Sequence, residues 1–540
     1  MRILIKGATI VDGSLAPAYV GNIILENESI VEVQRKIESE SGMADGKAQE
    51  LGSFDEIIDC TGLVASPGFI DTHSHSDLKV LIEPEILPKV MQGITTEVLG
   101  QDGISMAPLP KQYIDSWRKN LAGLDGESDE IDWEYENTSH YLNMIEKVGP
   151  GINESYLLPH GNVRMEAMGL ADRQPTADEI KLMCDITRRE MKAGCLGLST
   201  GLIYTPCAYA RTQEIIELCK VVAEFNGVFV VHQRSEADTI ISSMEEIIEI
   251  GRKSGVKIHY SHFKVCGLDN QDKLEDMLKI LDHAKEEGIM VSLDQYPYVA
   301  GSTMLGIILP PWAHDGGTNE LMKRLQNNKL RERMKEDIEK GLEGWDNFVQ
   351  FAGLSGIFIT SVASEKNRDL IGKNLVELGE IKGRDPLDAT FDLLLEEKNA
   401  VGMVDFYGTE EAVIKILKRE EMNACTDGLL AGKPHPRVYG SFPRILGKYV
   451  REEKVLTLEE AIYKMTYKAA LAMNIKNRGL IKVSYYGDIT IFNPDTVIDM
   501  GTFVDPIRYP RGIEYVFVNG ELAVKNGKPT RLRAGKVIRG

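Results

Sequence analysis

The sequence predicts an α/β protein: a (β/α)8 barrel of the TIM type, joined to a small β-sandwich domain built from both ends of the chain. Apolar, strand-like segments recur eight times along the middle of the chain, and stretches with the three-and-four apolar spacing of helices separate them. Strict alternation of strand and helix is typical of a parallel barrel. A long, highly charged stretch before the last strand predicts a helical insertion.

The eight predicted strands carry polar residues where they end. In chain order the segments are FIDTHSH (69–75), TEVLGQDG (96–103), SYLLPHGNVR (155–164), GCLGLSTG (194–201), GVFVVHQRSE (227–236), VKIHYSHFK (256–264), IMVSLDQYPY (289–298) and NACTDG (423–428). In a barrel of this type the catalytic side chains lie at the carboxyl ends of the strands. The polar ends of these segments are therefore the place to look for chemistry.

The two ends of the chain differ from the middle. Both consist of short runs of alternating apolar and polar residues, which are typical of antiparallel strands. The dipeptide Asn519-Gly520 lies between two such runs and predicts a tight hairpin. Residues 353–404 hold one further extended run and one helix that the alternation does not place. The predicted units are a β domain from residues 1–62 and 480–540, a barrel from residues 63–479, and a helical subdomain inserted at residues 305–350.

Composition excludes several classes of partner. The 540 residues include 82 acidic and 62 basic side chains, a formal net charge of −20, which disfavours binding to nucleic acid or to anionic membranes. No apolar run is long enough to cross a bilayer, and no targeting segment is recognisable at the start of the sequence. The seven cysteines form no CxxC pair. We therefore expect a cytoplasmic protein that acts on a small molecule; the sequence does not indicate an oligomeric state.

Potential metal ligands end most of the predicted strands. His73 and His75 both end the first strand, and residues two apart on a strand share a face. The other strand ends carry Asp102, His160, His232, His262 and Asp427. Imidazoles and carboxylates together form a zinc-type ligand set with room for a water molecule. Five of the ten histidines stand at these ends, and this placement predicts a metal centre.

Some of these residues have a structural interpretation as well. A single histidine at a strand end is more often held by hydrogen bonds than by a metal, and we apply this interpretation to His140, His259 and His283. For His160 both interpretations stand, because its neighbours also suit a polar turn. Asp102 is open in the same way: the glycines beside it mark a turn, yet its carboxylate could reach a metal held by the histidines of the first strand.

A divalent metal at this position limits the types of reaction that the protein is expected to catalyse. Such an ion lowers the pKa of a bound water and polarises a carbonyl oxygen. Asp427, at the end of the eighth strand, is placed to accept the proton of the water and pass it to the leaving group. The sequence therefore predicts hydrolysis of an amide, an imide or a related centre.

These motifs resemble the metal-dependent amidohydrolase superfamily and, more closely, its N-acyl-D-amino-acid deacylases (D-aminoacylases). The stretch PGFIDTHSH (67–75) is general to the superfamily, whereas YPYVAGST (296–303) and HPRVYGSFPR (435–444) are more specific to the deacylases. The resemblance covers almost the whole chain. It implies hydrolysis of an N-acyl-D-amino acid to a carboxylate and a free D-amino acid, with one or two Zn²⁺ ions or another divalent metal.

The resemblance also implies roles for single residues. His73, His75 and Asp427 match one metal site of the family, and His232 and His262 match the other. The family's substrate is a small molecule with a free α-carboxylate, and the residues that match its binding group are Lys264, Tyr296, Ser302 and Arg437. An Arg fork and a Lys charge suit a carboxylate; the alternative for Arg437 is a surface salt bridge. Tyr204 matches a position near the scissile bond.

Asp102 departs from the family pattern. The best-known members carry a cysteine ligand in a GNCGIS-like stretch, where this chain reads GQDGIS. A carboxylate is a harder ligand than a thiolate, and it offers two oxygens with which to bridge two ions. We therefore predict that Asp102 is a bridging ligand and that the metal preference is less restricted to zinc; a mononuclear site is the alternative.

Two other functions remain open at this point. A hydantoinase, dihydropyrimidinase or dipeptidase of the same superfamily usually carries a lysine on the fourth strand, and GCLGLSTG has none. A non-catalytic binding protein on this scaffold would be expected to lose metal ligands, which this chain keeps. The side chain of the substrate is not indicated, although Arg234 could receive an acidic one; its alternative is a salt bridge with Glu236.

Overall fold

A strand lies at each of the eight segments that the sequence predicts. The computed structural model describes residues 1–36, 53–126 and 128–540, so residues 37–52 of the predicted β domain lie outside the described residues. The eight segments pair in parallel. One sheet has the order β6 (Phe69–Asp71), β8 (Ile94–Leu99), β9 (Asn153–Tyr156). The other has the order β10 (Leu158–Pro159), β11 (Gly197–Gly201), β12 (Val228–His232), β13 (Lys257–Tyr260), β14 (Val291–Gln295), β18 (Met422–Ala424).

Neighbouring strands follow the order of the sequence, and the last segment returns to the first. Only Leu157 separates β9 from β10, and its amide donates to Leu99 O of β8 at 3.0 Å. At the other end, Asp427 N donates to His73 O at 2.9 Å. There the short strands β7 (Ser74–His75) and β19 (Gly428–Leu429) pair in parallel. The carboxyl ends of the first and last strands are thereby held side by side.

Helices connect the parallel strands, and local signals explain where they begin. In α6, Thr176 and Glu179 form a reciprocal capping box. Within the described parts of the chain, no helix is both long and apolar enough to cross a membrane. The connecting helices are α1 (Lys79–Ile82), α2 (Leu87–Val90), α3 (Ile114–Asp125), α4 (Thr138–Val148), α5 (His160–Met168), α6 (Ala177–Ala193), α7 (Thr212–Glu224), α8 (Ile240–Ser254), α9 (Leu274–Glu286) and α15 (Glu410–Leu417). The helices α16 (Arg437–Arg444), α17 (Leu458–Met465) and α18 (Tyr467–Ala472) follow the last parallel strand.

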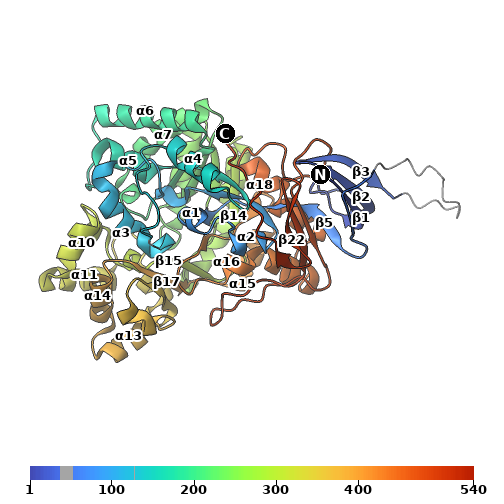
Figure 1. Ribbon diagram of the computed structural model, residues 1–540. Helices are drawn as coiled ribbons and strands as arrows, with labels where there is room; N and C mark the ends of the chain where they lie inside the picture. Colours follow the sequence, from blue (N-terminus) through green and yellow to red (C-terminus); the bar gives the residue numbers. More distant parts are fainter. Residues whose placement is uncertain (37–52, 127) are drawn as a thin grey trace.

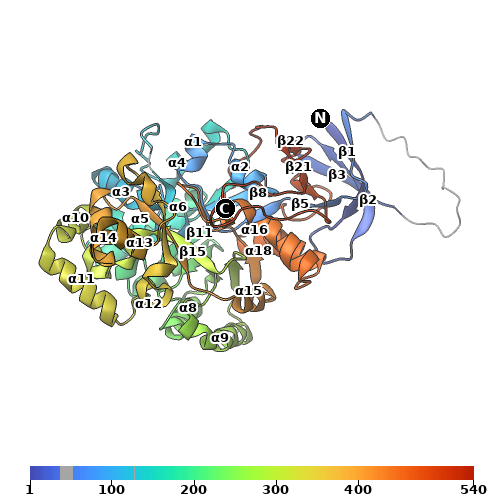
Figure 2. The same ribbon diagram turned by 90° about the horizontal axis from the view of Figure 1, so that it is seen from below.

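Strands from the two ends of the chain join in one nine-stranded sheet, which lies at one end of the molecule in both ribbon views (Figures 1 and 2). The predicted hairpin is confirmed: Asn519 and Gly520 have φ of 49° and 79° and connect two paired strands. Ile5, Ile23 and Ile489 belong to the separate apolar core of this sheet. Its strands are β1 (Arg2–Ile10), β2 (Tyr19–Glu26), β3 (Ser29–Arg35), β4 (Glu56–Asp59), β5 (Val64–Pro67), β20 (Ile489–Phe492), β21 (Ile513–Val518), β22 (Glu521–Lys525) and β23 (Lys528–Pro529).

The chain between β14 and β18 forms a small α/β unit of its own. Its antiparallel sheet has the order β15 (Ala300–Met304), β17 (Val401–Phe406), β16 (Ile357–Val362). The helices are α10 (Thr318–Leu325), α11 (Asn328–Lys340), α12 (Phe348–Ala352), α13 (Leu375–Lys382) and α14 (Pro386–Glu396). Helices α10, α11, α13 and α14 lie at the end of the molecule opposite the nine-stranded sheet (Figures 1 and 2). Residues 353–404, which the sequence left unplaced, supply two strands and two helices of this unit.

Candidate metal centre and active site

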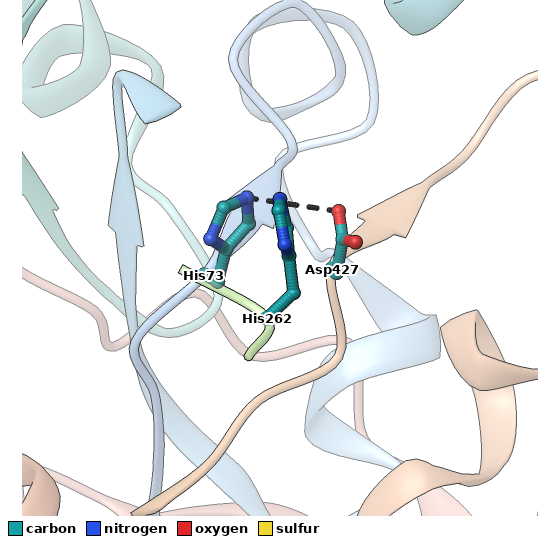
Figure 3. A group of neighbouring side chains, drawn as sticks. All are labelled: His73, His262 and Asp427. Carbon is teal, nitrogen blue, oxygen red and sulfur yellow. Dashed lines mark ion pairs between the residues drawn. The ribbon is translucent and has the colours of Figure 1, made fainter. Parts of the chain in front are cut away.

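Six side chains that we assigned to a metal site from the sequence meet at the carboxyl ends of the parallel strands. All six are buried: His73, His75, Asp102, His232, His262 and Asp427. Three overlapping triads among them each bring three ligand atoms within 4.8 Å of one another. Figure 3 shows His73, His262 and Asp427 directed toward a common point from three separate segments of the chain.

Two carboxylates lie between the imidazoles. Asp102 Oδ2 is 3.5 Å from His75 Nε2 and 3.7 Å from His73 Nε2, while its Oδ1 is 3.8 Å from His262 Nε2. Asp427 Oδ1 is 3.4 Å from His75 Nε2 and 3.6 Å from His73 Nε2. Asp102 thus faces both the pair on the first strand and His262 after the sixth. This central position is what a carboxylate shared by two ions requires.

Three residues of this cluster have left-handed backbones that disfavour ordinary side chains. Their φ angles are 55° at Asp102, 35° at His262 and 48° at Asp427. Such conformations each cost about 1–3 kcal/mol and persist where surrounding contacts enforce them. His262 N donates to Asp294 Oδ1 at 2.5 Å, which holds that backbone in place. The turns at the strand ends therefore serve to aim side chains, and Asp102 is both a turn residue and a member of the cluster.

A buried ionic network supports one side of the cluster. Asp71 Oδ2 accepts hydrogen bonds from Lys89 Nζ and Thr426 Oγ1, both at 2.6 Å, and Asp71 Oδ1 accepts one from Thr426 N at 2.8 Å. Asp71 lies two residues before His73 and Thr426 lies one residue before Asp427, and Lys89 Nζ is 3.3 Å from Glu97 Oε2. We missed this network in the sequence; the signal was a lysine isolated within the apolar stretch ILPKV.

A second network supports the other side. Glu236 Oε1 is 3.1 Å from His262 Nδ1, and Glu236 Oε2 is 2.6 Å from Lys264 Nζ. Burial opposes ionisation of Glu236, but Lys264 and the two neighbouring histidines lower its pKa to about 2. The predicted alternative of an Arg234–Glu236 salt bridge is wrong, because Arg234 Nε pairs with Glu246 Oε2 at 3.0 Å. Glu236 is closer to Arg234 in the sequence than Glu246 is, so the sequence did not indicate that Arg234 pairs with Glu246.

The residues expected to bind substrate line the same cavity as the cluster. This cavity opens to solvent, and its walls include Tyr204, Lys264, Tyr296, Ser302 and Arg437. Arg437 is fully buried, with Nη1 2.9 Å from Asp427 Oδ2 and its guanidinium 4.4 Å from the centre of the Tyr296 ring. A surface salt bridge is therefore excluded for Arg437. Arg234, the candidate for an acidic substrate group, does not line this cavity.

The other residues that we predict to contact substrate form hydrogen bonds with neighbouring protein groups. Tyr204 OH lies 2.9 Å from Thr303 Oγ1, and Ser302 Oγ donates to Met403 O at 2.8 Å. Tyr296 OH lies 2.7 Å from the hydroxyl of Tyr407, a cavity residue that we did not foresee. Strand β15 and strand β17 of the inserted unit supply most of these partners, so the insertion forms one wall of the cavity.

His160 is held away from the cluster. Its Nδ1 lies 2.9 Å from Thr200 Oγ1, and its Nε2 lies 2.9 Å from Glu214 Oε1. Both ring nitrogens are therefore used by hydrogen bonds. His259 is likewise bonded at both nitrogens, to Ser292 and Asp294. For both histidines, these hydrogen bonds fit the structural role and not a role as metal ligand.

The cluster itself fits a divalent cation. Within the described residues, both ring nitrogens of His73, Oδ1 of Asp102 and Nε2 of His232 are buried and have no hydrogen-bond partner. Burial lowers the pKa of His232 to about 4 and so keeps the imidazole neutral. Burial alone would raise the pKa of Asp102, but His73 and the other histidines hold it well below its usual range. Neutral imidazoles and ionised carboxylates are the forms that bind zinc, and His232 and Asp102 are in these forms. Burial lowers the pKa of His75 and of His262, but Asp102 and Asp427 raise that of His75 to about 10 and Glu236 and Asp102 raise that of His262 to about 9. Metal binding at these two imidazoles would therefore release a proton from each.

The sequence profile of the amidohydrolase family matches residues 56–333 and 428–524. Three curated proteins of Alcaligenes xylosoxydans xylosoxydans align over nearly the whole chain. A D-aminoacylase is 31% identical over 99% of this chain and 97% of its own length. An N-acyl-D-aspartate deacylase is 30% identical (99% and 94%), and an N-acyl-D-glutamate deacylase is 30% identical (100% and 96%).

Solved structures give the same picture. The chain superposes on a D-aminoacylase crystal structure with a TM-score of 0.81 and 30% identity, covering 100% of this chain and 99% of the other. The N-acyl-D-glutamate deacylase of Bordetella bronchiseptica, solved with zinc and a phosphonate mimic of the tetrahedral intermediate, has a TM-score of 0.81 and 29% identity over 100% and 99% of the two chains. An L-hydantoinase of Arthrobacter aurescens shares only the fold, with a TM-score of 0.54 and 12% identity over 100% and 99%.

Proposed function

Because the chain belongs to the amidohydrolase family and, within it, to the N-acyl-D-amino-acid deacylases, we propose that it hydrolyses the amide bond of N-acyl-D-amino acids. The products are a carboxylate and a free D-amino acid. The observation that carries this proposal is the shared cavity: two aspartates and three of the four cluster histidines line it together with the cations Lys264 and Arg437, and His73 lies within ligand distance of them. A hydrolytic centre and a site for an α-carboxylate are thus combined.

The proposed cofactor is Zn²⁺, with one or two ions bound. We assign His73, His75 and Asp427 to one site, His232 and His262 to the other, and Asp102 to a position shared by both. A zinc ion bound there supplies a water of lowered pKa and polarises the scissile carbonyl. The relative with zinc and a phosphonate inhibitor supports the choice of metal and of reaction.

Asp427 is the proposed proton carrier. One of its oxygens faces His73 and His75, and the other pairs with Arg437 Nη1. Burial opposes its ionisation, but Arg437 and His73 hold the pKa of Asp427 well below its usual range. The carboxylate is therefore ionised, and we assign to it the transfer of a proton from water to the leaving nitrogen.

The α-carboxylate of the substrate is assigned to Lys264, Tyr296, Ser302 and Arg437, and Tyr204 is assigned to the region of the scissile bond. Arg437 keeps a planar fork in the cavity wall, stacked on Tyr296. Such a fork suits bidentate contact with a carboxylate. The two cations would fix the substrate at one end and leave its amide directed toward the cluster.

The domain organisation is part of the same proposal. The order of parallel strands, the return of the eighth segment to the first and the connecting helices support a closed (β/α)8 barrel at residues 63–479. The nine-stranded sheet supports a small β-sandwich domain from residues 1–62 and 480–540. The inserted subdomain at residues 305–350 would be part of the larger unit between β14 and β18. A cytoplasmic location is supported by seven unpaired cysteines.

Hydrolysis of a cyclic amide is not favoured, because the hydantoinase shares only the fold and β11 carries no lysine. The direct test compares N-acetyl-D-leucine with N-acetyl-L-leucine, using protein stripped of metal by a chelator and the same protein reloaded with Zn²⁺. We expect turnover of the D form only and only after reloading. Turnover of the L form, or full activity without metal, would contradict the proposal.

A further inference from the structure

Charged side chains line much of the cavity, in addition to the histidines of the cluster. Its described walls contain two cations, Lys264 and Arg437, and five carboxylates. Arg437 is paired with Asp427 and Lys264 with Glu236. The five carboxylates are Asp102, Glu236, Asp346, Asp405 and Asp427.

Four of these carboxylates have partners. Besides the two ion pairs, Asp102 faces three histidines. Asp346 accepts hydrogen bonds from Ser235 Oγ and from Glu236 N, both at 2.6 Å. Among the described residues, no other residue forms a hydrogen bond or an ion pair with the Asp405 side chain, although it is only 3% exposed. Burying an ionised carboxylate without a partner is unfavourable.

The pairing of β15 and β17 leaves the Asp405 carboxylate facing the cavity. Asp405 lies on β17 opposite Gly301 of β15. A Cβ atom at Gly301 would lie only 3.0 Å from Asp405 Oδ1, so the glycine leaves the carboxylate open to the cavity. Burial raises the pKa of Asp405 to about 7, because Lys264 and Arg437 offset the loss of solvent only in part. A hydrogen-bond donor or a cation on a ligand would supply the missing partner.

Asp405 lies outside the two blocks that match the family profile. Residues 334–427 fall between the two matched blocks, and they include β16, β17 and Asp346. Two of the three curated relatives act on acyl derivatives of acidic D-amino acids. A negative group in the cavity wall opposes binding of such a side chain.

We propose that Asp405 is a specificity-determining residue that makes this enzyme reject N-acyl-D-aspartate and N-acyl-D-glutamate and favour substrates whose side chain carries a hydrogen-bond donor or a positive charge. This inference rests on the proposed function. The repulsion between Asp405 and the α-carboxylate is common to every substrate, so it cancels when two side chains are compared. What remains is the interaction of Asp405 with the side chain itself.

The test uses substrate pairs that differ only in charge: N-acetyl-D-aspartate against N-acetyl-D-asparagine, and N-acetyl-D-glutamate against N-acetyl-D-glutamine. Assays use the zinc-loaded protein at pH 8.5, where Asp405 is ionised. We expect kcat/KM for each amide to exceed that of its acid by about tenfold or more. N-acetyl-D-lysine should likewise exceed N-acetyl-D-glutamate. In Asp405→Asn the ratio within each pair should fall toward one.

Asp346→Asn is the matched control. Its carboxylate lines the same cavity but is occupied by Ser235 and Glu236, so the substitution should change both members of a pair by the same factor. Equal kcat/KM for acid and amide in the unaltered protein would overturn the inference, even if Asp405→Asn failed to fold. A ratio unchanged by Asp405→Asn would also overturn it. Failure of the proposed function is distinguishable, because then N-acetyl-D-leucine would not be hydrolysed either.

Discussion

Two buried polar clusters of this protein differ in how their polar atoms are paired. One is the group of histidines and aspartates at the carboxyl ends of the parallel strands. The other lies between the parallel strands and the nine-stranded sheet, where Arg478 and Asp488 form an ion pair and Asn519 and Asn153 surround it. Both clusters are almost fully excluded from solvent.

The difference lies in how completely their polar atoms are used. In the second cluster, Arg478 Nη2 donates to Asn519 Oδ1 at 2.8 Å, Asn519 N donates to Asp488 Oδ1 at 2.7 Å, and Asn519 Nδ2 donates to Asn153 Oδ1 at 2.7 Å. None of the buried side-chain atoms of these four residues lacks a partner within the described chain. In the strand-end cluster several do. A buried polar group normally has a hydrogen-bond partner. Converging buried atoms without partners therefore indicate a ligand site, whereas a network in which every atom has a partner indicates a structural role.

The largest expected effect is a loss of kcat, without a loss of folding, when Asp427 of the strand-end cluster is replaced. Asp427→Asn removes the proton acceptor and should lower kcat by about 10²- to 10⁴-fold. Circular dichroism and metal content should show that the protein still folds and binds zinc. The control is Asp499→Asn, which alters a carboxylate paired with Arg444 outside the cavity and should leave kcat near its original value. Retention of activity in Asp427→Asn would refute the assigned role.

Next in size is an effect on stability in the second cluster. Asp488→Ala leaves Arg478 buried without its counter-ion and should lower the free energy of unfolding by about 3–5 kcal/mol. Urea denaturation measures this change, and kcat of the remaining folded protein should be unaffected. Glu56→Ala, which removes the surface pair with Lys525, should cost less than about 1 kcal/mol. If the two substitutions lower the free energy of unfolding by the same amount, the second cluster does not have the structural role that we assign to it.

The smallest expected effect concerns Asp102. Asp102→Ala should weaken zinc binding by at least about tenfold, because even the loss of an outer contact has an effect of that size. Asp102→Cys restores the residue type of the best-known family members and should recover zinc binding. Metal content after dialysis against a graded series of chelator concentrations distinguishes the two variants. An unchanged zinc affinity in Asp102→Ala would show that the carboxylate is only part of the turn.

The sequence predicted the elements whose signals are local. Strands are recognisable from short apolar runs, the hairpin at Asn519-Gly520 from two residues that tolerate positive φ, and the six cluster residues from their position where strands end. These predictions held because parallel strands bring their carboxyl ends together whatever the loops do. The family motifs added the residues that we predict to bind substrate, all of which line the cavity.

Tertiary structure alone decided the partners of the charged residues. Arg234 pairs with Glu246 rather than Glu236, Lys89 pairs with Asp71, and Asp405 lies opposite Gly301 with no ion-pair partner in the described part of the chain. The sequence by itself determined which chemistry could assemble, since the ligands lie within strand-end motifs. Which charges neutralise one another depends on contacts between segments far apart in the chain, and in the cavity wall on the packing of β15 and β17. Electrostatic attraction acts through space, and the order of residues does not encode those distances directly.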